Sequence, residues 1–320
     1  MIRWLGQFVF SLRVFRRCAL FPVLLFVAVA SLPAAEGKKL RIVTTILPLY
    51  SFASTIIGDK GEVQNLLPPT VGPHDYQLSP SDLRKLREAD LVIFNGAGLD
   101  NWVAKALGGT EKGRILEMSS LFNAELISAA PDLDLSGEHK HSHDHQHSPS
   151  NPHFWLDPQL AIRCVTNIST AAEKLDSANG AVYARNAEAY VARLNVLDRE
   201  IATKLAPVKD KPFLTQHDAF PYFIRRYNLN LAGVLEPTPD VSPSPRYLAD
   251  LLKVVREKNV HVLFADPQAS QRLPRQVAHD AHIRLGELDT IERGAFRPQA
   301  YEEGMRRNAE TLARELSNGK

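Results

Sequence analysis

Histidine is the residue type whose distribution most clearly indicates chemistry in this sequence. Five of the eleven histidines fall in one polar tract: His139, His141, His143, His145 and His147. A sixth, His153, follows in the segment Asn-Pro-His-Phe-Trp-Leu-Asp-Pro (151–158). Neutral imidazole is the commonest metal ligand among side chains, and a histidine-rich tract is typical of metal binding. The sequence therefore predicts metal binding, with two regions that could carry it.

The two regions differ in expected order. Residues 138–150 offer nothing from which to build a hydrophobic core, so we expect a mobile, solvated loop whose histidines form at most a weak accessory metal site. His153 is surrounded by aromatic residues and prolines, which predict an ordered segment. A tight metal site is therefore more compatible with His153 than with the tract.

Three more polar residues follow predicted strands. His74 lies in the loop after the strand 63–67, His217 follows the strand 213–216, and Asp289 follows the strand 284–288. Ligands of open α/β sheets bind beyond the carboxyl ends of the strands. Together with His153, these residues offer three imidazoles and one carboxylate, a suitable donor set for tetrahedral Zn²⁺. No cysteine lies near them, so a soft ion such as Cu⁺ is not indicated.

The elements that position these residues alternate between strand and helix in both halves of the chain. This order predicts two α/β lobes, each with a mostly parallel sheet flanked by helices. A helical segment rich in Ala, Leu, Glu, Arg and Lys separates them and predicts a long rigid connecting helix, with a metal cleft between the lobes. A break is expected at Ser177-Ala178-Asn179-Gly180, and a packed antiparallel helix pair is the alternative interpretation. The expected boundaries are 36–156 for the first lobe, 157–206 for the connecting segment and 207–320 for the second lobe.

The N-terminus predicts export. Residues 1–17 carry four arginines and no acid, the run 19–30 is apolar, and small residues follow. This order is typical of a cleaved signal peptide, here assigned to residues 1–35, and the run is shorter than the roughly 20 residues of a membrane span. An uncleaved N-terminal anchor is the alternative. We expect a periplasmic protein.

Charge and cysteine usage narrow the class further. Without its four leader arginines the chain has 38 − 4 = 34 basic against 36 acidic residues, so no basic patch argues for nucleic acid. Cys18 belongs to the leader, which leaves Cys164 alone and excludes an intrachain disulfide. We expect a monomer stabilised by its core.

Several motifs together resemble the zinc and manganese solute-binding proteins of ABC importers, the cluster A-I family, and within it the ZnuA-like zinc branch. They lie at residues 72–80, 151–158, 217–227, 266–268 and 288–289. The resemblance implies one metal ion held between two lobes that a long helix joins. Carried over by position, it implies His74, His153, His217 and Asp289 as the ligands. A histidine-rich loop before the second ligand is also typical of the zinc branch.

His217 is the position that favours Zn²⁺ over Mn²⁺, because manganese members usually carry a carboxylate there. Three departures from the family pattern stand out: Gly72 in place of a frequent acid, Asp266-Pro-Gln in place of Glu-Pro-Gln, and Thr-Ile-Glu after Asp289. The last makes water or Glu292 an alternative fourth ligand.

The resulting hypothesis is a periplasmic zinc-binding protein that performs no catalysis and delivers Zn²⁺ to the membrane permease of an ABC transporter. A manganese-binding member of the same family is the first alternative. An exported zinc-dependent hydrolase is the second, although no acid stands at helical spacing from a histidine as in HExxH. A metal-dependent adhesin or buffer, in which the histidine tract is the functional part, is the third.

Overall fold

The computed structural model describes residues 39–74, 76–108, 114–122, 124–128, 150–237 and 241–318. Residues 38–320 form one compact unit. The predicted signal peptide (1–35) and the histidines of the tract, His139 to His147, lie outside the described residues.

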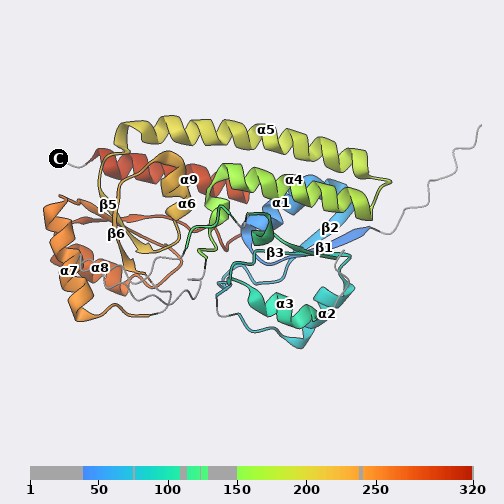
Figure 1. Cartoon of the computed structure of the whole chain (residues 1–320), viewed down its shortest axis with the longest axis horizontal. Helices are drawn as coiled ribbons and strands as arrows, with labels where there is room; N and C mark the ends of the chain where they lie inside the picture. The colour runs from blue at the N-terminus through green and yellow to red at the C-terminus, as the bar shows by residue number, and fades with distance from the viewer. Residues whose placement is uncertain are drawn as a thin grey trace, which may run out of the picture. The chain divides into compact units, whose positions relative to one another are not determined.

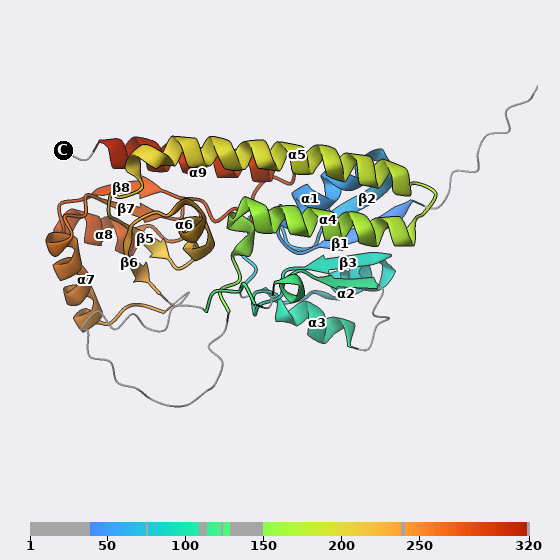
Figure 2. The same cartoon turned by 45° about the horizontal axis from the view of Figure 1, so that its top comes forward.

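The first lobe is built on a parallel four-stranded sheet (Figures 1 and 2). Its strands in chain order are β1 (Leu40–Thr44), β2 (Gly61–Asn65), β3 (Leu91–Phe94) and β4 (Ile115–Glu117), arranged as β2-β1-β3-β4. Its helices are α1 (Leu47–Ile57), α2 (Pro80–Glu88) and α3 (Asn101–Leu107).

Alternating strand residues face two different cores, as the pleat requires. Ile42 and Ile93 belong to the large core that also contains residues of α1, whereas Val43 and Val92 pack with residues of α2 and α3. Both faces of this sheet are therefore covered by helices, which explains why its strands read as nearly continuous apolar runs.

The second lobe repeats this plan. Its strands are β5 (Phe213–His217), β6 (Leu231–Glu236), β7 (Val262–Ala265) and β8 (Arg284–Glu287), all parallel and arranged as β6-β5-β7-β8. Its helices are α6 (Pro221–Tyr227), α7 (Pro245–Glu257), α8 (Arg272–Asp280) and α9 (Ala300–Ser317). The expected architecture of two parallel-sheet α/β lobes is confirmed.

Two long helices connect the lobes. The 18-residue α4 (Pro158–Leu175) packs against α1 and α5, and the 26-residue α5 (Gly180–Leu205) packs against α1 at one end and α9 toward the other. At 1.5 Å per residue α5 is about 39 Å long, which lets it run along both lobes (Figures 1 and 2). The predicted break falls between α4 and α5, so the connecting segment is both a helix pair and a long connecting helix. The exact lobe boundaries at 156/157 and 206/207 stay a prediction.

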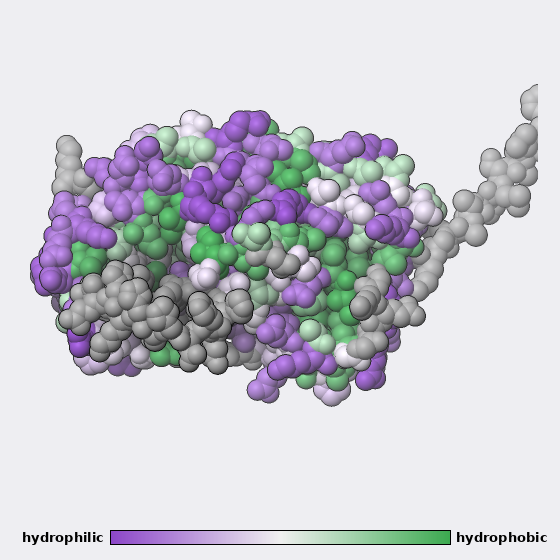
Figure 3. All heavy atoms as spheres, viewed as in Figure 1, coloured by the Kyte–Doolittle hydropathy of each residue, from purple (hydrophilic) through white to green (hydrophobic). Residues whose placement is uncertain are grey.

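One hydrophobic core extends across both lobes through these helices. It includes Phe52 of the first lobe, Trp155 at the junction, Tyr190 of α5, and Phe264 and Tyr301 of the second lobe. Hydrophilic side chains cover much of the outer surface along α5 and α9 (Figure 3). None of the described helices combines the length and apolar composition that crossing a bilayer requires.

Candidate metal centre

His74 comes from the loop between β2 and α2 of the first lobe. Trp102 Nε1 donates a hydrogen bond to the carbonyl oxygen of the preceding Pro73 at 3.2 Å, which attaches this loop to α3. The loop ends at Ser79, whose hydroxyl accepts a hydrogen bond from Asp82 N at 3.2 Å in a capping box that starts α2. The His74 side chain is 29% exposed.

His153 lies at the junction between the first lobe and α4, and it is only 1% exposed. It directly precedes a short 3₁₀ turn, η4 (Phe154–Leu156), and Asp157 then caps α4 through a 2.9 Å hydrogen bond from Gln159 N. The aromatic residues predicted to order this segment are buried.

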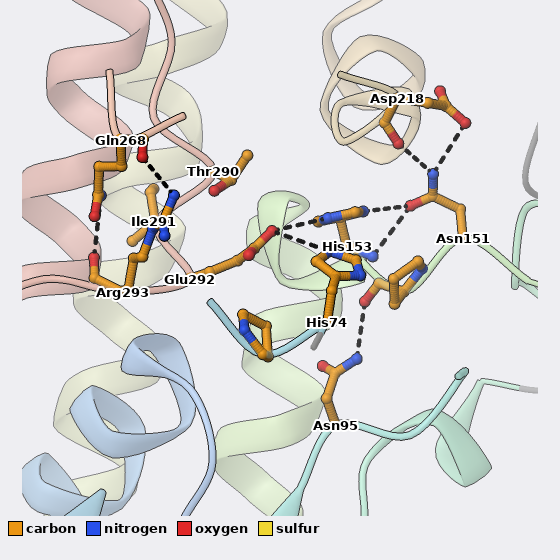
Figure 4. A network of polar contacts seen from close by, with 12 residues as sticks. His74, Asn95, Asn151, His153, Asp218, Gln268, Thr290, Ile291, Glu292 and Arg293 are labelled. Carbon is orange, nitrogen blue, oxygen red and sulfur yellow. Dashed lines mark hydrogen bonds and ion pairs between the residues drawn. The ribbon is translucent and has the colours of Figure 1, made fainter. Parts of the chain in front are cut away.

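Asn151 fixes the orientation of the His153 ring (Figure 4). Its side-chain oxygen accepts a hydrogen bond from His153 N at 3.1 Å and lies 3.0 Å from His153 Nδ1. An amide oxygen can only accept, so the proton of the neutral ring is on Nδ1 and Nε2 carries the lone pair. The amide nitrogen of Asn151 donates to the carbonyl oxygen of Asp218 at 2.6 Å, next to His217 in the second lobe.

His217 is the last residue of β5 and is therefore placed by a central strand of the second sheet. Its ring centroid lies 5.1 Å from that of His153 and 5.9 Å from that of His74. Burial, with a smaller contribution from His153, lowers the pKa of His217 to about 3. The ring is therefore neutral near pH 7 and can donate a lone pair to a metal ion.

Glu292 comes from the turn after β8 and points toward His153 and His74 (Figure 4). Its Oε1 lies 3.0 Å from His153 Nε2 and 3.9 Å from His74 Nε2. Burial by itself would raise its pKa, but the hydrogen bond to His153 and the electrostatic contributions of the neighbouring histidines outweigh burial and lower the pKa to about 2. Glu292 Oε1 and His153 Nε2 therefore lie side by side as two potential metal donors, 3.0 Å apart.

Within the described part of the chain, one group of residues could hold a metal ion. It consists of His74, His153, His217 and Glu292, whose ligand atoms all lie within 4.8 Å of one another. The donors are three imidazole nitrogens and one carboxylate oxygen, and each lobe or its junction contributes. This chemistry and spacing suit a tetrahedral Zn²⁺ ion, which binds nitrogen at about 2.0–2.1 Å.

The structure brings together the three expected histidines but not the expected aspartate. Asp289 is not a member of the group; its Oδ1 accepts hydrogen bonds from Ile291 N at 2.8 Å and Gln268 Nε2 at 3.2 Å. The chain turns after Asp289, so the side chain three residues later enters the site. Glu292, which the sequence offered only as an alternative to Asp289, takes the fourth position.

A cavity of about 350 Å³ opens beside this group, and His74, His217 and Glu292 line it. Asp266 and Glu236 lie on its wall. Burial, together with the negative charges of Glu292 and Asp289, raises the pKa of Asp266 to about 6. The wall is acidic near pH 7, which favours the approach of cations over anions.

Asn151 is a neighbour of the candidate site that the sequence did not single out. The available signal was its place two residues before His153 in Asn-Pro-His, because metal-binding histidines usually have a hydrogen-bond partner for the other ring nitrogen. That its amide also reaches Asp218 depends on the packing of the second lobe against the junction. No sequence pattern gives that contact.

The comparison with known families decides the class of the protein. The profile of the family described as "ZnuA: Zinc-uptake complex component A periplasmic" matches residues 42–315. The chain belongs to this family. The ZnuA family consists of substrate-binding proteins of metal uptake, so the chain is a binding protein and not an enzyme.

Relatives and solved structures agree with this assignment. The chain is 34% identical over 261 residues to "High-affinity zinc uptake system protein ZnuA" of Bacillus subtilis, which covers 81% of this chain and 80% of that protein. It is 30% identical to "Zinc-binding protein AdcA" of Streptococcus pyogenes over 87% of this chain, and spans only 56% of that longer protein.

Two metal-bound structures are similar in fold. FpvC of Pseudomonas aeruginosa in complex with Mn²⁺ has a TM-score of 0.74 at 29% identity and covers 88% of this chain and 100% of its own. Zn(II)-bound AdcA of Streptococcus pneumoniae has a TM-score of 0.70 at 26% identity and covers 88% of this chain and 58% of its own.

Proposed function

We propose that this ZnuA-family chain is the zinc-binding component of an ABC-type importer. It binds one Zn²⁺ ion through His74, His153, His217 and Glu292 and delivers the ion to a membrane permease. The observation that carries the proposal is the convergence of these four buried or half-buried donors within 4.8 Å. Since His74 and His153 come from the first lobe and its junction, and His217 and Glu292 from the second, the ion joins both lobes.

The donor set favours Zn²⁺ over Mn²⁺. Imidazole suits zinc, whereas manganese prefers carboxylate, carbonyl and water oxygens. The Mn²⁺-bound FpvC structure keeps manganese as the competing ion within the same function. Metal analysis therefore has to include both ions.

Export to the periplasm is part of the proposal. It is supported by the predicted signal peptide (1–35) and by the family description as a periplasmic component. A hydrolytic zinc enzyme is disfavoured because catalytic zinc sites keep one coordination position open, whereas four protein donors converge here.

The decisive experiment measures metal in protein isolated from its native compartment. We expect about one zinc ion per chain and little manganese, and we expect cells that lack the protein to need added zinc for growth. Manganese as the main ion, or unchanged growth under zinc limitation, would contradict the proposal.

A second measurement separates the site from the histidine tract. Deletion of residues 138–150 is expected to leave the tight zinc affinity unchanged in a chelator competition. If the deletion abolishes tight binding, the tract and not the four-residue group is the main metal site.

A further inference from the structure

The turn that carries Glu292 has an unusual backbone. Ile291 has φ = 62°, and it is the only β-branched residue with positive φ in the described part of the chain. A β-branched side chain strongly disfavours this left-handed conformation, so the surrounding structure must hold it in place. The turn lies directly before Glu292 and determines where that carboxylate points.

Asp289 supplies a local clamp on this turn. Its Oδ1 accepts a hydrogen bond from Ile291 N at 2.8 Å, the pattern in which an aspartate bonds its own backbone two residues on. Gln268 strengthens the clamp, since its Nε2 donates to the same Oδ1 at 3.2 Å and to the carbonyl oxygen of Arg293 at 3.3 Å. Arg293 in turn donates to the carbonyl oxygen of Gln268 at 2.7 Å (Figure 4).

Longer-range contacts hold the backbone on either side of Ile291. Asn308 of α9 binds both backbone groups of Asp289, at 2.9 Å to its N–H and 2.7 Å to its carbonyl oxygen. Trp155 Nε1 donates to the carbonyl oxygen of Thr290 at 2.9 Å, and Leu47 N donates to that of Glu292 at 3.0 Å. Every residue of the turn is therefore fixed by a hydrogen bond.

Gly304 of α9 makes room for the Ile291 side chain. A Cβ atom at this position would lie 2.9 Å from Ile291 Cδ1 and 3.0 Å from its Cγ1, closer than real contacts allow. A glycine inside a helix costs stability relative to alanine, and here the absent side chain lets α9 pack closely on the turn.

We infer that Asp289 is a positioning residue: it holds Thr290 to Glu292 in the left-handed turn and thereby aims the Glu292 carboxylate at the three histidines. It acts through hydrogen bonding and not as a metal ligand. This role rests on the proposed zinc site and explains how a glutamate three residues beyond the aspartate expected from the sequence can complete it.

The test compares two substitutions at one position. Asparagine in Asp289→Asn keeps an oxygen that can accept from Ile291 N, whereas Asp289→Ala removes it. We expect Asp289→Asn to bind Zn²⁺ within about threefold of the unchanged protein and Asp289→Ala to lose about 10-fold or more, the usual loss for an outer hydrogen-bond partner of a metal site. Glu292→Gln, which removes the ligand charge, is expected to lose at least as much. Affinities come from competition with a chromophoric chelator.

The visible absorption of Co²⁺-substituted protein supplies a second readout. Asp289→Asn should retain the spectrum of the unchanged protein, while Glu292→Gln should alter it. An altered spectrum and weak binding in Asp289→Asn, with Glu292→Gln unaffected, would make Asp289 the ligand and overturn the inference. Unchanged affinity in Asp289→Ala would equally overturn it.

Folding and the zinc site are controlled separately. Thermal melting of the metal-free proteins shows whether Asp289→Ala folds. If it does not, Gln268→Ala, at an exposed position, takes its place. This variant removes the second donor to Asp289 Oδ1 and is expected to weaken zinc binding by a smaller factor. Unchanged zinc affinity in Gln268→Ala would then overturn the inference. Failure of the unchanged protein to bind Zn²⁺ refutes the proposed function itself, which keeps the two failures distinct.

Discussion

The two sheets of the molecule have the same strand order, but their corresponding strand ends carry residues with different roles. The inner strand β1 of the first sheet corresponds to β5 of the second. β1 lies between β2 and β3, and β5 lies between β6 and β7. β5 ends in the metal-site residue His217. β1 ends in Thr44, and the hydroxyl of Thr45, directly after it, donates to Asp100 at 2.7 Å. The end of this strand carries a candidate metal-site residue in one lobe, whereas the residue just beyond it fixes a loop in the other.

The other members of the candidate metal site come from non-equivalent points of the two lobes. His74 follows β2 and His153 lies beyond β4 at the start of the connecting helices, whereas Glu292 lies in the turn after β8. The repeated scaffold brings strand ends together, and individual loops decide which residues enter the candidate site.

The largest expected effect comes from removing one proposed ligand from the first-lobe junction or from the second lobe. His153→Ala and His217→Ala should each weaken Zn²⁺ binding by about 100-fold or more, because loss of an outer partner alone costs roughly 10–100-fold. Chelator competition measures the affinities, with His279→Ala on the exposed surface of α8 as the matched control. Loss in only one variant would mean that a single lobe holds the ion.

A second prediction concerns how His217, at the end of β5, makes the stability of the protein depend on pH. The folded pKa of His217, about 3, lies below its ordinary value of 6.5, so the unfolded chain binds more protons between these pH values. The free energy of unfolding of the metal-free protein should therefore fall as pH drops from 6.5 toward 3, by about 2 kcal/mol at pH 5 from this residue. Denaturant unfolding at pH 6.5 and 5 measures it.

His217→Asn provides the control for that measurement, because it removes the titrating ring and should reduce the loss between the two pH values. An equal loss in both proteins would show that other groups, and not the end of β5, dominate acid sensitivity. Thr45 at the corresponding end of the first sheet cannot titrate in this range.

A third prediction concerns Asn151, which links His153 at the junction to Asp218 in the second lobe. Asn151→Ala removes the partner of His153 Nδ1 and the bond to Asp218, so zinc affinity should fall about 10-fold, near the lower limit for such partners. Asn167→Ala is the matched control, since the Asn167 amide bonds only to Arg163 of its own helix among the contacts described. Equal affinities in the two variants would remove Asn151 from the site.

The smallest expected effect is a change in shape on binding. α5 packs against α1 and α9, and α9 contacts both α1 and β8, so rigid helices and one shared core oppose hinge bending between the lobes. We expect solution X-ray scattering of metal-free and zinc-loaded protein to agree within error. A large compaction on adding zinc would show that the lobes close as separate bodies.

Much of the fold was predictable because it depends on local patterns. Apolar strands, the cap at Ser79 and the break before Gly180 are short-range signals, and the structure contains each of them. The two-lobe architecture followed from the order of these elements. The sequence could not distinguish a packed helix pair from a single long connecting helix, because amino-acid composition does not show the direction in which helices pack.

The three histidines of the candidate site were predictable from local signals, because His74 and His217 follow predicted strands and His153 lies in an ordered aromatic segment. The fourth member depends on long-range packing. Whether Asp289 or Glu292 reaches the histidines depends on the left-handed turn at Ile291, which a β-branched residue disfavours locally. Asn308, Trp155 and Gly304, all distant in sequence, stabilise that turn, so no local pattern could have shown which carboxylate faces the three histidines.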